Sequence, residues 1–415
     1  MSKIEDSWPI TRRTAICQIA KTTIGAAGIC RKILGESNSL ATGAVRLEQQ
    51  PTGSEIWQIT TERFQQSNIY CELPYCSGDS RYFIYERKNP RLKGGNKIEL
   101  IAVEIRTWKQ HLLDVAIGIS GSAISSNGVF YYLKYTDDHV LGLMRTDLSE
   151  GKPRRVFQMK QEQQIVSMGT ISPDGRYYTW GKRIDNEYKR FGILLIDLEK
   201  QTKAIIDEDS YIFNPHPQFE PADGEQLLIQ HNRGGTFSPE GKLQQLVGPE
   251  GATLYLLSLS GRQRTNLQVG TPYTTPVTGH QVWIGETKDI LLTVMARGDY
   301  LPEKGNLLAI RADEPARVVA RGYKFNHVNV SRCGRFFCCD DWQQNCKIVI
   351  GSITTGRTAV VCESQTSRGQ PQNTHAHAYL TPDLRWVIFN SDRNGFPHVH
   401  AASVPNEMIQ GISRT

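Results

Sequence analysis

The turn Ser172-Pro173-Asp174-Gly175 lies between two β-rich runs, and variants of it recur along the chain. Such a tetrapeptide is typical of a tight turn, because proline presets φ, aspartate bonds to nearby backbone and glycine accepts positive φ. The Pro-equivalent positions of the seven copies are residues 78, 126, 173, 221, 285, 332 and 382. Five of the six intervals are 47 to 50 residues long and one is 64 residues long, so the chain is predicted to contain seven repeats.

The runs that follow the turns predict β-strands. Residues 81–85, 129–132 and 386–389 are aromatic and β-branched, as strands should be. Sheets stacked with this period close into a ring. The sequence therefore predicts an all-β fold, a seven-bladed β-propeller with four-stranded blades, over residues 45–415.

Two irregularities refine this prediction. The long interval contains the extra residues 234–251, which we expect to form a loop on one rim that is placed to cover a site. After Val404 the last blade lacks a fourth strand, whereas residues 53–60 have the pattern of an outer strand. We therefore expect an N-terminal strand to close the last blade.

Composition narrows the class of protein and its partners. The 415 residues are 39% hydrophobic, and no run approaches the roughly 20 apolar residues of a membrane-spanning helix, so no integral membrane span is expected. The net charge is +6, and no cluster of Lys and Arg is interleaved with aromatic residues, which argues against nucleic acid as a partner. A small anionic substrate is consistent with this charge.

Residues 1–44 are predicted to lie outside the propeller. Thr11-Arg12-Arg13 precedes a weakly apolar stretch at residues 15–29, a pattern that resembles a twin-arginine export signal. Lys21 interrupts the apolar stretch, so a plain amphipathic extension stays open as an alternative. A working signal would place the protein in the periplasm or outside the cell, and otherwise it is expected in the cytoplasm.

Three potential metal ligands, Gln372, His375 and His377, lie within six residues. His375 and His377 are two residues apart, so in an extended chain both side chains point to one face. Gln372 can join them if the preceding chain is a loop, which the Gly-Gln-Pro run at residues 369–371 allows. Two imidazoles and a carboxamide at this spacing indicate a first-row divalent cation.

Four of the ten histidines occupy one position in consecutive repeats. Counting back five residues from the Pro-equivalent position reaches, in blades 4 to 7, His216, His280, His327 and His377. Because this position lies on the innermost strand, the four side chains are predicted to converge on the propeller axis. A ring of hydrogen-bonded imidazoles in a solvated channel would explain any one of them, whereas the whole set, with the nearby Gln and His, favours a metal site.

Counting ten residues forward from the same position reaches the end of the second strand, on the rim where the histidines begin. In blade 4 this residue is His231. It is either a solvated loop histidine or, because it is expected beside a bound cation, a catalytic residue. The equivalent positions and their neighbours provide candidate cations for substrate binding, namely Lys88, Arg183, Arg233 and Arg393. This rim is therefore predicted to be basic.

These motifs resemble the oligogalacturonate lyase family, seven-bladed propellers that cleave short pectin fragments by β-elimination. The string Gln372-x-x-His375-x-His377 matches the family's Gln-x-x-His-x-His motif, and His280 with Trp283 matches its His-x-x-Trp strand. The resemblance covers residues 53–404. It implies that a manganese ion is held by His280, Gln372, His375 and His377.

Further matches and departures affect the expected substrate. The His-Pro pair at His216 matches a strand start of the family, and the His-x-x-x-Ser string at His327 matches another of its strands. His231 falls where the family has its proposed base. Residues 232–234 read Asn-Arg-Gly where the family usually has Glu-Gly-Pro, and residues 68–75 lack the expected basic and aromatic string. These departures affect the expected identity of the substrate more than the expected type of reaction.

The resemblance implies a metal-dependent carbon-oxygen lyase that converts oligogalacturonides to unsaturated uronate products. A cation at the C6 carboxylate would stabilise the charge that develops as the C5 proton leaves, and His231 is expected to take that proton. His216 and His327 complete the expected substrate contacts. Nickel or zinc would also suit these ligands, so the choice of manganese comes from the resemblance. A lyase acting on another uronate oligosaccharide and a non-catalytic propeller that binds metal or sugar stay open.

Overall fold

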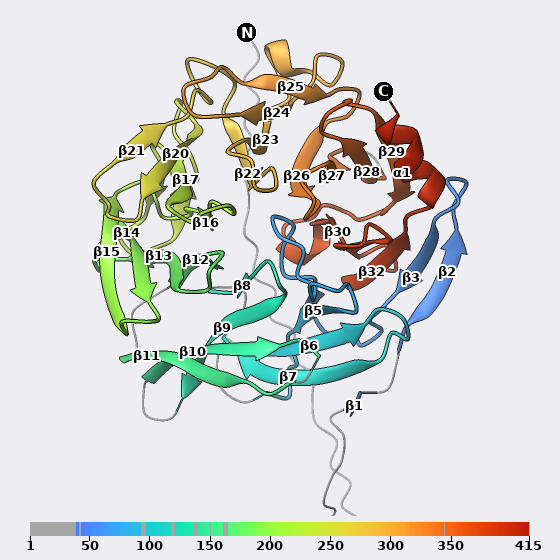
Figure 1. Cartoon of the computed structure of the whole chain (residues 1–415), viewed down its shortest axis with the longest axis horizontal. Coiled ribbons are helices and arrows are strands. Elements are labelled where there is room, and N and C mark those ends of the chain that lie inside the picture. Colours follow the sequence, from blue (N-terminus) through green and yellow to red (C-terminus); the bar gives the residue numbers. More distant parts are fainter. Residues whose placement is uncertain are drawn as a thin grey trace, which may run out of the picture. The chain divides into compact units, whose positions relative to one another are not determined.

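The computed structural model describes residues 39–40, 43–92, 97–117, 121–136, 140–149, 151–160, 165–343 and 345–414. Within the compact unit Asn38–Thr415, seven antiparallel sheets are arranged around a common axis (Figure 1). The prediction of an all-β, seven-bladed propeller is confirmed. The twin-arginine-like segment at residues 11–29 lies outside the described residues.

The first four blades follow the predicted order of strands from the axis outward. Blade 1 consists of β4 (Gln66–Ser67), β5 (Tyr82–Arg87), β6 (Ile98–Glu104) and β7 (Gln110–Ala116). Blade 2 consists of β8 (Ala123–Ile124), β9 (Val129–Thr136), β10 (Val140–Asp147) and β11 (Arg154–Lys160). Blade 3 consists of β12 (Ile165–Ile171), β13 (Tyr177–Arg183), β14 (Phe191–Asp197) and β15 (Thr202–Asp209). Blade 4 consists of β16 (Gln218–Phe219), β17 (Gln226–Asn232), β20 (Ala252–Ser258) and β21 (Arg264–Asn266).

The last three blades bring the chain back to its start. Blade 5 consists of β22 (Val277–Trp283), β23 (Ile290–Val294), β24 (Leu307–Ile310) and β25 (Arg317–Ala320). Blade 6 consists of β26 (Phe325–Val330), β27 (Phe336–Asp341), β28 (Lys347–Ser352) and β29 (Thr358–Glu363). Blade 7 combines β30 (Tyr379–Leu380), β31 (Trp386–Ser391) and β32 (His398–Ser403) with two earlier strands, β3 (Glu55–Gln58) and β2 (Val45–Gln49).

The Ser-Pro-Asp-Gly turn joins β12 to β13 through a defined set of hydrogen bonds. The Gly175 N–H donates to the Ser172 carbonyl oxygen at 2.8 Å, and the Tyr177 N–H donates to the Ser172 hydroxyl oxygen at 2.8 Å. Gly175 has a φ of +73°, which glycine adopts without strain. The bond from backbone to hydroxyl recurs in blades 1, 2, 6 and 7, at Ser77, Ser125, Ser331 and Thr381. The repeated turn thus connects the two inner strands in the same way around the ring.

The ring closes at blade 7, as predicted. β3 pairs antiparallel with β32, with Trp57 opposite Ala401, and therefore supplies the fourth strand. β2 adds a fifth strand that the sequence pattern did not predict, and β1 (Ser39–Leu40) adds a fifth strand to blade 1. Trp108 of blade 1 contacts both Trp57 and Trp386, with ring centroids 5.8 Å and 5.1 Å apart. Three tryptophan side chains therefore pack against one another where the first and last blades meet.

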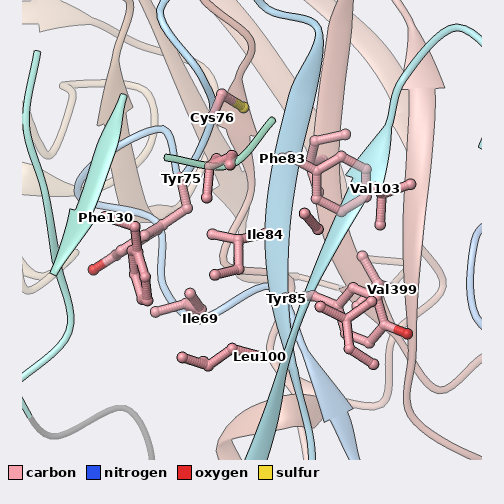
Figure 2. Packing of buried hydrophobic residues seen from close by; sticks show 14 of the residues in the cluster. Ile69, Tyr75, Cys76, Phe83, Ile84, Tyr85, Leu100, Val103, Phe130 and Val399 are labelled. Atoms are coloured by element: carbon pink, nitrogen blue, oxygen red, sulfur yellow. The ribbon is translucent and has the colours of Figure 1, made fainter. Parts of the chain in front are cut away.

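The hydrophobic core lies between neighbouring sheets. Figure 2 shows the cluster around β5, where Ile84 is accompanied by Phe130 of β9 and Val399 of β32. All three side chains are fully buried. Because each sheet is covered on both faces, strands such as β6 consist of nearly continuous apolar residues rather than an alternation of polar and apolar ones.

The insertion at residues 234–251 forms the hairpin of β18 (Thr236–Phe237) and β19 (Leu243–Gln245). Phe237 packs on Phe213 at 4.9 Å and stacks on Tyr188 at 5.7 Å. The hairpin is therefore attached to blade 3 through Tyr188, which lies between β13 and β14. The chain ends in α1 (Asn406–Ser413), and no helix in the described ranges has the length and apolar composition needed to cross a membrane.

Candidate metal centre

The four histidines of the repeat register lie together in the structure. His280 is part of β22 and His327 is part of β26, whereas His216 and His377 each lie two residues before an inner strand. The rings of His280 and His327 are 4.2 Å apart, and those of His327 and His377 are 4.5 Å apart. The ring of Tyr70 contacts His216 at 5.6 Å and His377 at 4.6 Å. Side chains from five blades therefore meet in one axial group.

The backbone is irregular where these histidines leave the inner strands. The pairing of β22 with β23 and that of β26 with β27 both shift register across the histidine position. Such bulges turn a side chain away from the regular alternation. His216 and His377 have φ of +41° and +43°, in the left-handed region, where a non-glycine residue is strained by about 1 to 3 kcal/mol. The fold thus holds the backbone of these two residues in a strained conformation, which sets the direction of their rings.

Three imidazoles have the arrangement of metal ligands. One nitrogen of each of His327, His375 and His377 lies within 4.8 Å of the other two. His375 follows the short turn η2 (Gln372–Thr374) with extended backbone angles, so it enters the group from the loop before β30. The rings of His375 and His377 are 5.6 Å apart. The loop and the bulged strand β26 together build the trio.

At least one nitrogen of each ring has no hydrogen bond to a described residue and is free for an ion. His327 Nδ1 lies 2.7 Å from Asp340 Oδ2, and His375 Nε2 lies 2.9 Å from the Gly369 carbonyl oxygen. Because both partners are oxygen acceptors, these nitrogens carry the protons and the opposite nitrogens keep their lone pairs. Among the described residues, none bonds to His375 Nδ1 or to either nitrogen of His377, although all three atoms are buried.

These unpartnered atoms fit a divalent cation. A buried imidazole nitrogen without a partner is costly, and a bound ion would satisfy it. Burial lowers the pKa of His375 and lowers that of His377 well below its usual value, and the neighbouring histidines add to both effects. The rings therefore remain neutral, as ligands must be. Asp340 behind His327 is the kind of partner that orients a metal-bound histidine.

The trio differs from the ligand set that the resemblance implies, which is His280, Gln372, His375 and His377. His280 lies beside His327 with its Nδ1 3.0 Å from the Thr278 hydroxyl oxygen, and is the nearest further imidazole. Gln372 is exposed at the start of η2, and no described residue is hydrogen-bonded to its side chain. His327, expected to bind substrate, is a member of the trio. Counting residues locates a strand position but not the direction of a ring.

Trp342 and Arg368 extend the site, and neither residue was predicted from the sequence. The ring of Trp342 meets those of His375 and His327 at 4.9 Å and 5.3 Å. The Arg368 guanidinium lies 5.6 Å over the Trp342 ring, and its buried Nε has no hydrogen-bond partner in the described part of the chain. Trp342 occupies the same register position as His231, ten residues beyond the turn, so this count could have located it. Arg368 lies in a loop that the register does not reach.

Comparison with solved structures gives matches over most of the chain. An oligogalacturonate lyase in complex with manganese superposes with a TM-score of 0.69 at 15% identity, covering 91% of this chain and 100% of its own. An oligogalacturonate lyase from Vibrio parahaemolyticus gives 0.66 at 14% identity, covering 90% of this chain and 100% of its own. This chain has the oligogalacturonate lyase fold.

The resemblance predicted from the motifs is confirmed at the level of the fold. Neither the protein-family models nor the curated proteins give a match to this chain. A solved structure of a differently named protein, U3-55K, superposes with a TM-score of 0.50 at 7% identity over 84% of this chain and 98% of its own. Because one fold supports many functions, the function has to be argued from the site.

His231, the expected base, belongs to another hydrogen-bond network. Its Nε2 lies 3.0 Å from Asp209 Oδ1, and its ring meets those of Tyr211 and Tyr255 at 5.6 Å and 6.0 Å. Burial acts to raise the pKa of Asp209, but hydrogen bonds from His231, the Tyr211 N–H and Arg264 hold it well below its usual range. Asp209 and Arg264 come from β15 and β21, the outermost strands of their blades. Within the described residues, the hydrogen-bond and ring partners of His231 do not include the trio.

The four expected cations have different environments. Arg183 is 7% exposed and stacks on a tyrosine ring at 4.1 Å, and in the described chain its buried Nε and Nη1 have no hydrogen-bond partner. Arg233 donates to two backbone carbonyls, and Arg393 pairs with Glu48 at 2.8 Å. Lys88 is exposed. Arg183 therefore has the guanidinium nitrogens most in need of an anion.

A buried carboxylate, Glu72, joins the axial group without having been predicted. Its Oε1 lies 2.7 Å from His216 Nδ1, and its side chain is 4% exposed. Burial raises the pKa of Glu72, while the charge of His216 and the hydrogen bond to it act in the opposite direction. Glu72 also lines a cavity of about 320 Å³ bordered by the turns of blades 2 to 6. It lies between β4 and β5 in a loop that has no counterpart in the repeat, so the register could not indicate it.

Proposed function

We propose that this protein is a metal-dependent lyase that cleaves short 4-linked uronate oligosaccharides, oligogalacturonides first among them, by β-elimination. The observation that supports this best is the trio His327, His375 and His377, in which one ring nitrogen of each residue lies within 4.8 Å of the other two. The fold shared with two oligogalacturonate lyases supports the reaction class.

His327, His375 and His377 would hold the ion, with His280 as a further candidate. When bound, a divalent cation would supply Lewis-acid stabilisation of the negative charge that develops on the C6 carboxylate of the substrate. Manganese is the proposed ion because one of the lyases of this fold is a manganese complex. Imidazole ligands would also accept zinc or nickel, so the metal content needs direct measurement.

Cationic side chains of this chain would bind the carboxylates of the substrate. Arg368 has an unpartnered Nε beside the trio, and a guanidinium matches a carboxylate through two parallel hydrogen bonds. Arg183 has two unpartnered nitrogens and suits a second uronate unit. A substrate with several carboxylates would satisfy groups that are otherwise buried without partners.

The reaction also needs a base for the C5 proton. Outside the trio, His231 has one nitrogen fixed by Asp209 and His216 has one fixed by Glu72, and this arrangement leaves the other nitrogen able to accept a proton. The family resemblance favours His231. Membership of the axial group favours His216.

A substrate panel tests the proposed function. Manganese-loaded protein is mixed separately with digalacturonate, trigalacturonate, a glucuronate-bearing oligosaccharide and an algal oligouronate, and ultraviolet absorbance detects the unsaturated product. We expect product from an oligogalacturonide and its loss on adding a chelator. His327→Ala should be inactive, while His111→Ala, in the outer strand β7, should remain active. Product from another uronate alone would change the substrate, and no product from any of them would refute the lyase proposal.

A further inference from the structure

His216 and Glu72 form an oriented imidazole and carboxylate pair inside the axial group. We infer that His216 is the base that removes the C5 proton in the proposed lyase reaction and that Glu72 is its positioning residue. This inference rests on the proposed function.

The hydrogen bond between the two residues prepares His216 to accept a proton. Glu72 Oε1 accepts from His216 Nδ1 at 2.7 Å, which leaves the lone pair on Nε2. No described residue is hydrogen-bonded to Nε2, and the His216 side chain is 12% exposed. Nε2 is therefore open to a ligand, while the ring is held in one tautomer and one orientation.

The location of His216 agrees with the chemistry. C5 of a uronate is bonded directly to C6, so the base must lie close to the group that binds the C6 carboxylate. The ring of Tyr70 contacts both His216 and His377, at 5.6 Å and 4.6 Å, and it lies 6.4 Å from His280. His216 and His377 thus contact the same aromatic ring, and the inferred binding mode places the uronate with its carboxylate at the trio and C5 toward His216.

The other candidates fit this role less well. The described side-chain contacts of His231 are with Asp209 at the end of β15, with Tyr211 in the loop that follows, and with Tyr255 of β20, and none of these residues belongs to the axial group. Burial raises the pKa of Tyr70 well above its usual value, so its hydroxyl would keep its proton. The lone pairs of the trio would be used by the ion.

The local energetics also indicate a function at this position. Glu72 is a carboxylate buried in the axial group, and such burial is destabilising unless hydrogen bonds compensate it. His216 has a φ of +41° directly before Pro217, a conformation that costs about 1 to 3 kcal/mol. Backbone strain at one residue and a buried charge on its hydrogen-bond partner are frequent where a reactive side chain has to be held in place.

The proposed step is balanced within the substrate and the base. The C5–H bond breaks and its proton moves to His216 Nε2, while its electron pair forms the C4=C5 double bond. The C4–O4 bond breaks and its electron pair leaves on O4, which takes a proton from solvent. His216 later returns its proton to solvent, so the reaction needs no oxidant, reductant or net water.

Four variants of the full chain test the inference with the uronate that the wild type cleaves. His216→Asn is the main variant, because asparagine tolerates the left-handed backbone but is not a base. His216→Gly relieves the strain and opens space for added imidazole. Glu72→Gln removes the charge from the positioning residue. His111→Asn is the matched control on the outer strand β7.

We expect His216→Asn to lower kcat by about 10²- to 10⁴-fold with KM changed by less than about threefold. Manganese affinity, measured by titration calorimetry, should be unchanged. Imidazole should restore turnover in His216→Gly, which a purely structural role would not allow. Glu72→Gln should lower kcat about tenfold at constant KM, and His111→Asn should match the wild type.

The outcomes separate this inference from the proposed function. A wild type that forms no unsaturated product overturns the function and the inference together. A wild type and a His216→Asn variant that form product at equal rates overturn the base assignment alone. Loss of turnover in His231→Ala with normal turnover in His216→Asn would assign the base to His231 instead.

Discussion

His327 shows how one hydrogen bond defines the role of a histidine. Its side chain is 2% exposed and that of its partner Asp340 is 0% exposed, so the pair is completely enclosed. Asp340 holds the proton on Nδ1 and thereby leaves the lone pair on Nε2, in a ring that lies next to those of His375 and His377. The ring is thereby prepared to be a ligand rather than a donor to substrate.

Single substitutions should separate the two ligand sets. His327→Ala is expected to abolish tight manganese binding, because it removes one of three converging nitrogens. Gln372→Ala should change the affinity by less than about threefold, and Asp340→Asn should weaken it by about 10- to 100-fold through loss of orientation. Calorimetric titration with manganese measures all three. A large loss in Gln372→Ala with normal binding in His327→Ala would support the ligand set of the resemblance.

His400 should make stability depend on pH. It is fully buried, its ring stacks on Phe389 at 5.4 Å, and burial lowers its pKa to about 3. The unfolded chain binds this proton near pH 6.5, so the contribution of His400 is complete above that pH and is lost as the pH falls toward 3. From pH 6.5 to 5 the free energy of unfolding should decrease by about 2 kcal/mol on this account.

Urea unfolding at pH 7 and pH 5 measures this effect. His400→Gln lacks the titrating group and should lose less stability than the wild type over the same interval. The other histidines titrate in both proteins, so the difference between the two reports His400 alone. Equal losses in the two proteins would contradict the expected pKa.

At the scale of elements, the closing strand β3 is the least local part of the fold. It pairs with β32, which lies more than 300 residues later, and it carries the fully buried Ile56 and the ring of Trp57. Residues on the neighbouring β2 are all exposed. The stability of the ring therefore depends on β3 and much less on β2.

Two shortened chains test the role of these strands. A chain that starts at residue 61 loses β3 and leaves the edge of β32 unpaired, and we expect it to lose about 3 to 5 kcal/mol of unfolding free energy or to aggregate. A chain that starts at residue 50 loses β2 but keeps β3, and should lose only about 1 to 2 kcal/mol, because the buried Arg393 loses its partner Glu48. Chemical denaturation of both chains gives these values. Equal stability of the two chains would show that β3 does not close the ring.

At the scale of the whole propeller, an ion at the trio would connect neighbouring blades. His327 belongs to β26 of blade 6, whereas His375 and His377 precede β30 of blade 7. Binding to the folded state alone stabilises it by mass action. Manganese at 100 times its dissociation constant should therefore raise the free energy of unfolding by about 2.7 kcal/mol, and a chelator should reverse the gain. His327→Ala should show no gain, and a wild type whose unfolding is indifferent to manganese would contradict the site.

The sequence by itself determined the features that are local or periodic. Turn chemistry such as that at Ser172 repeats with the blade, so the number of blades, the closing strand and the convergence of His280 and His327 could be predicted by counting. Each of these features depends on residues within one repeat or on the spacing between repeats.

Only the tertiary structure decided which atoms meet. Side-chain directions at bulges and loops form the pairs of Glu72 with His216 and of Asp340 with His327. They also decide where Arg368 lies and place His231 in a separate network. Glu72 and His216 are 144 residues apart, and nothing in either segment indicates the other. They come together because ring closure brings blades 1 and 4 to the same axis, where strained backbone angles set the direction of each ring.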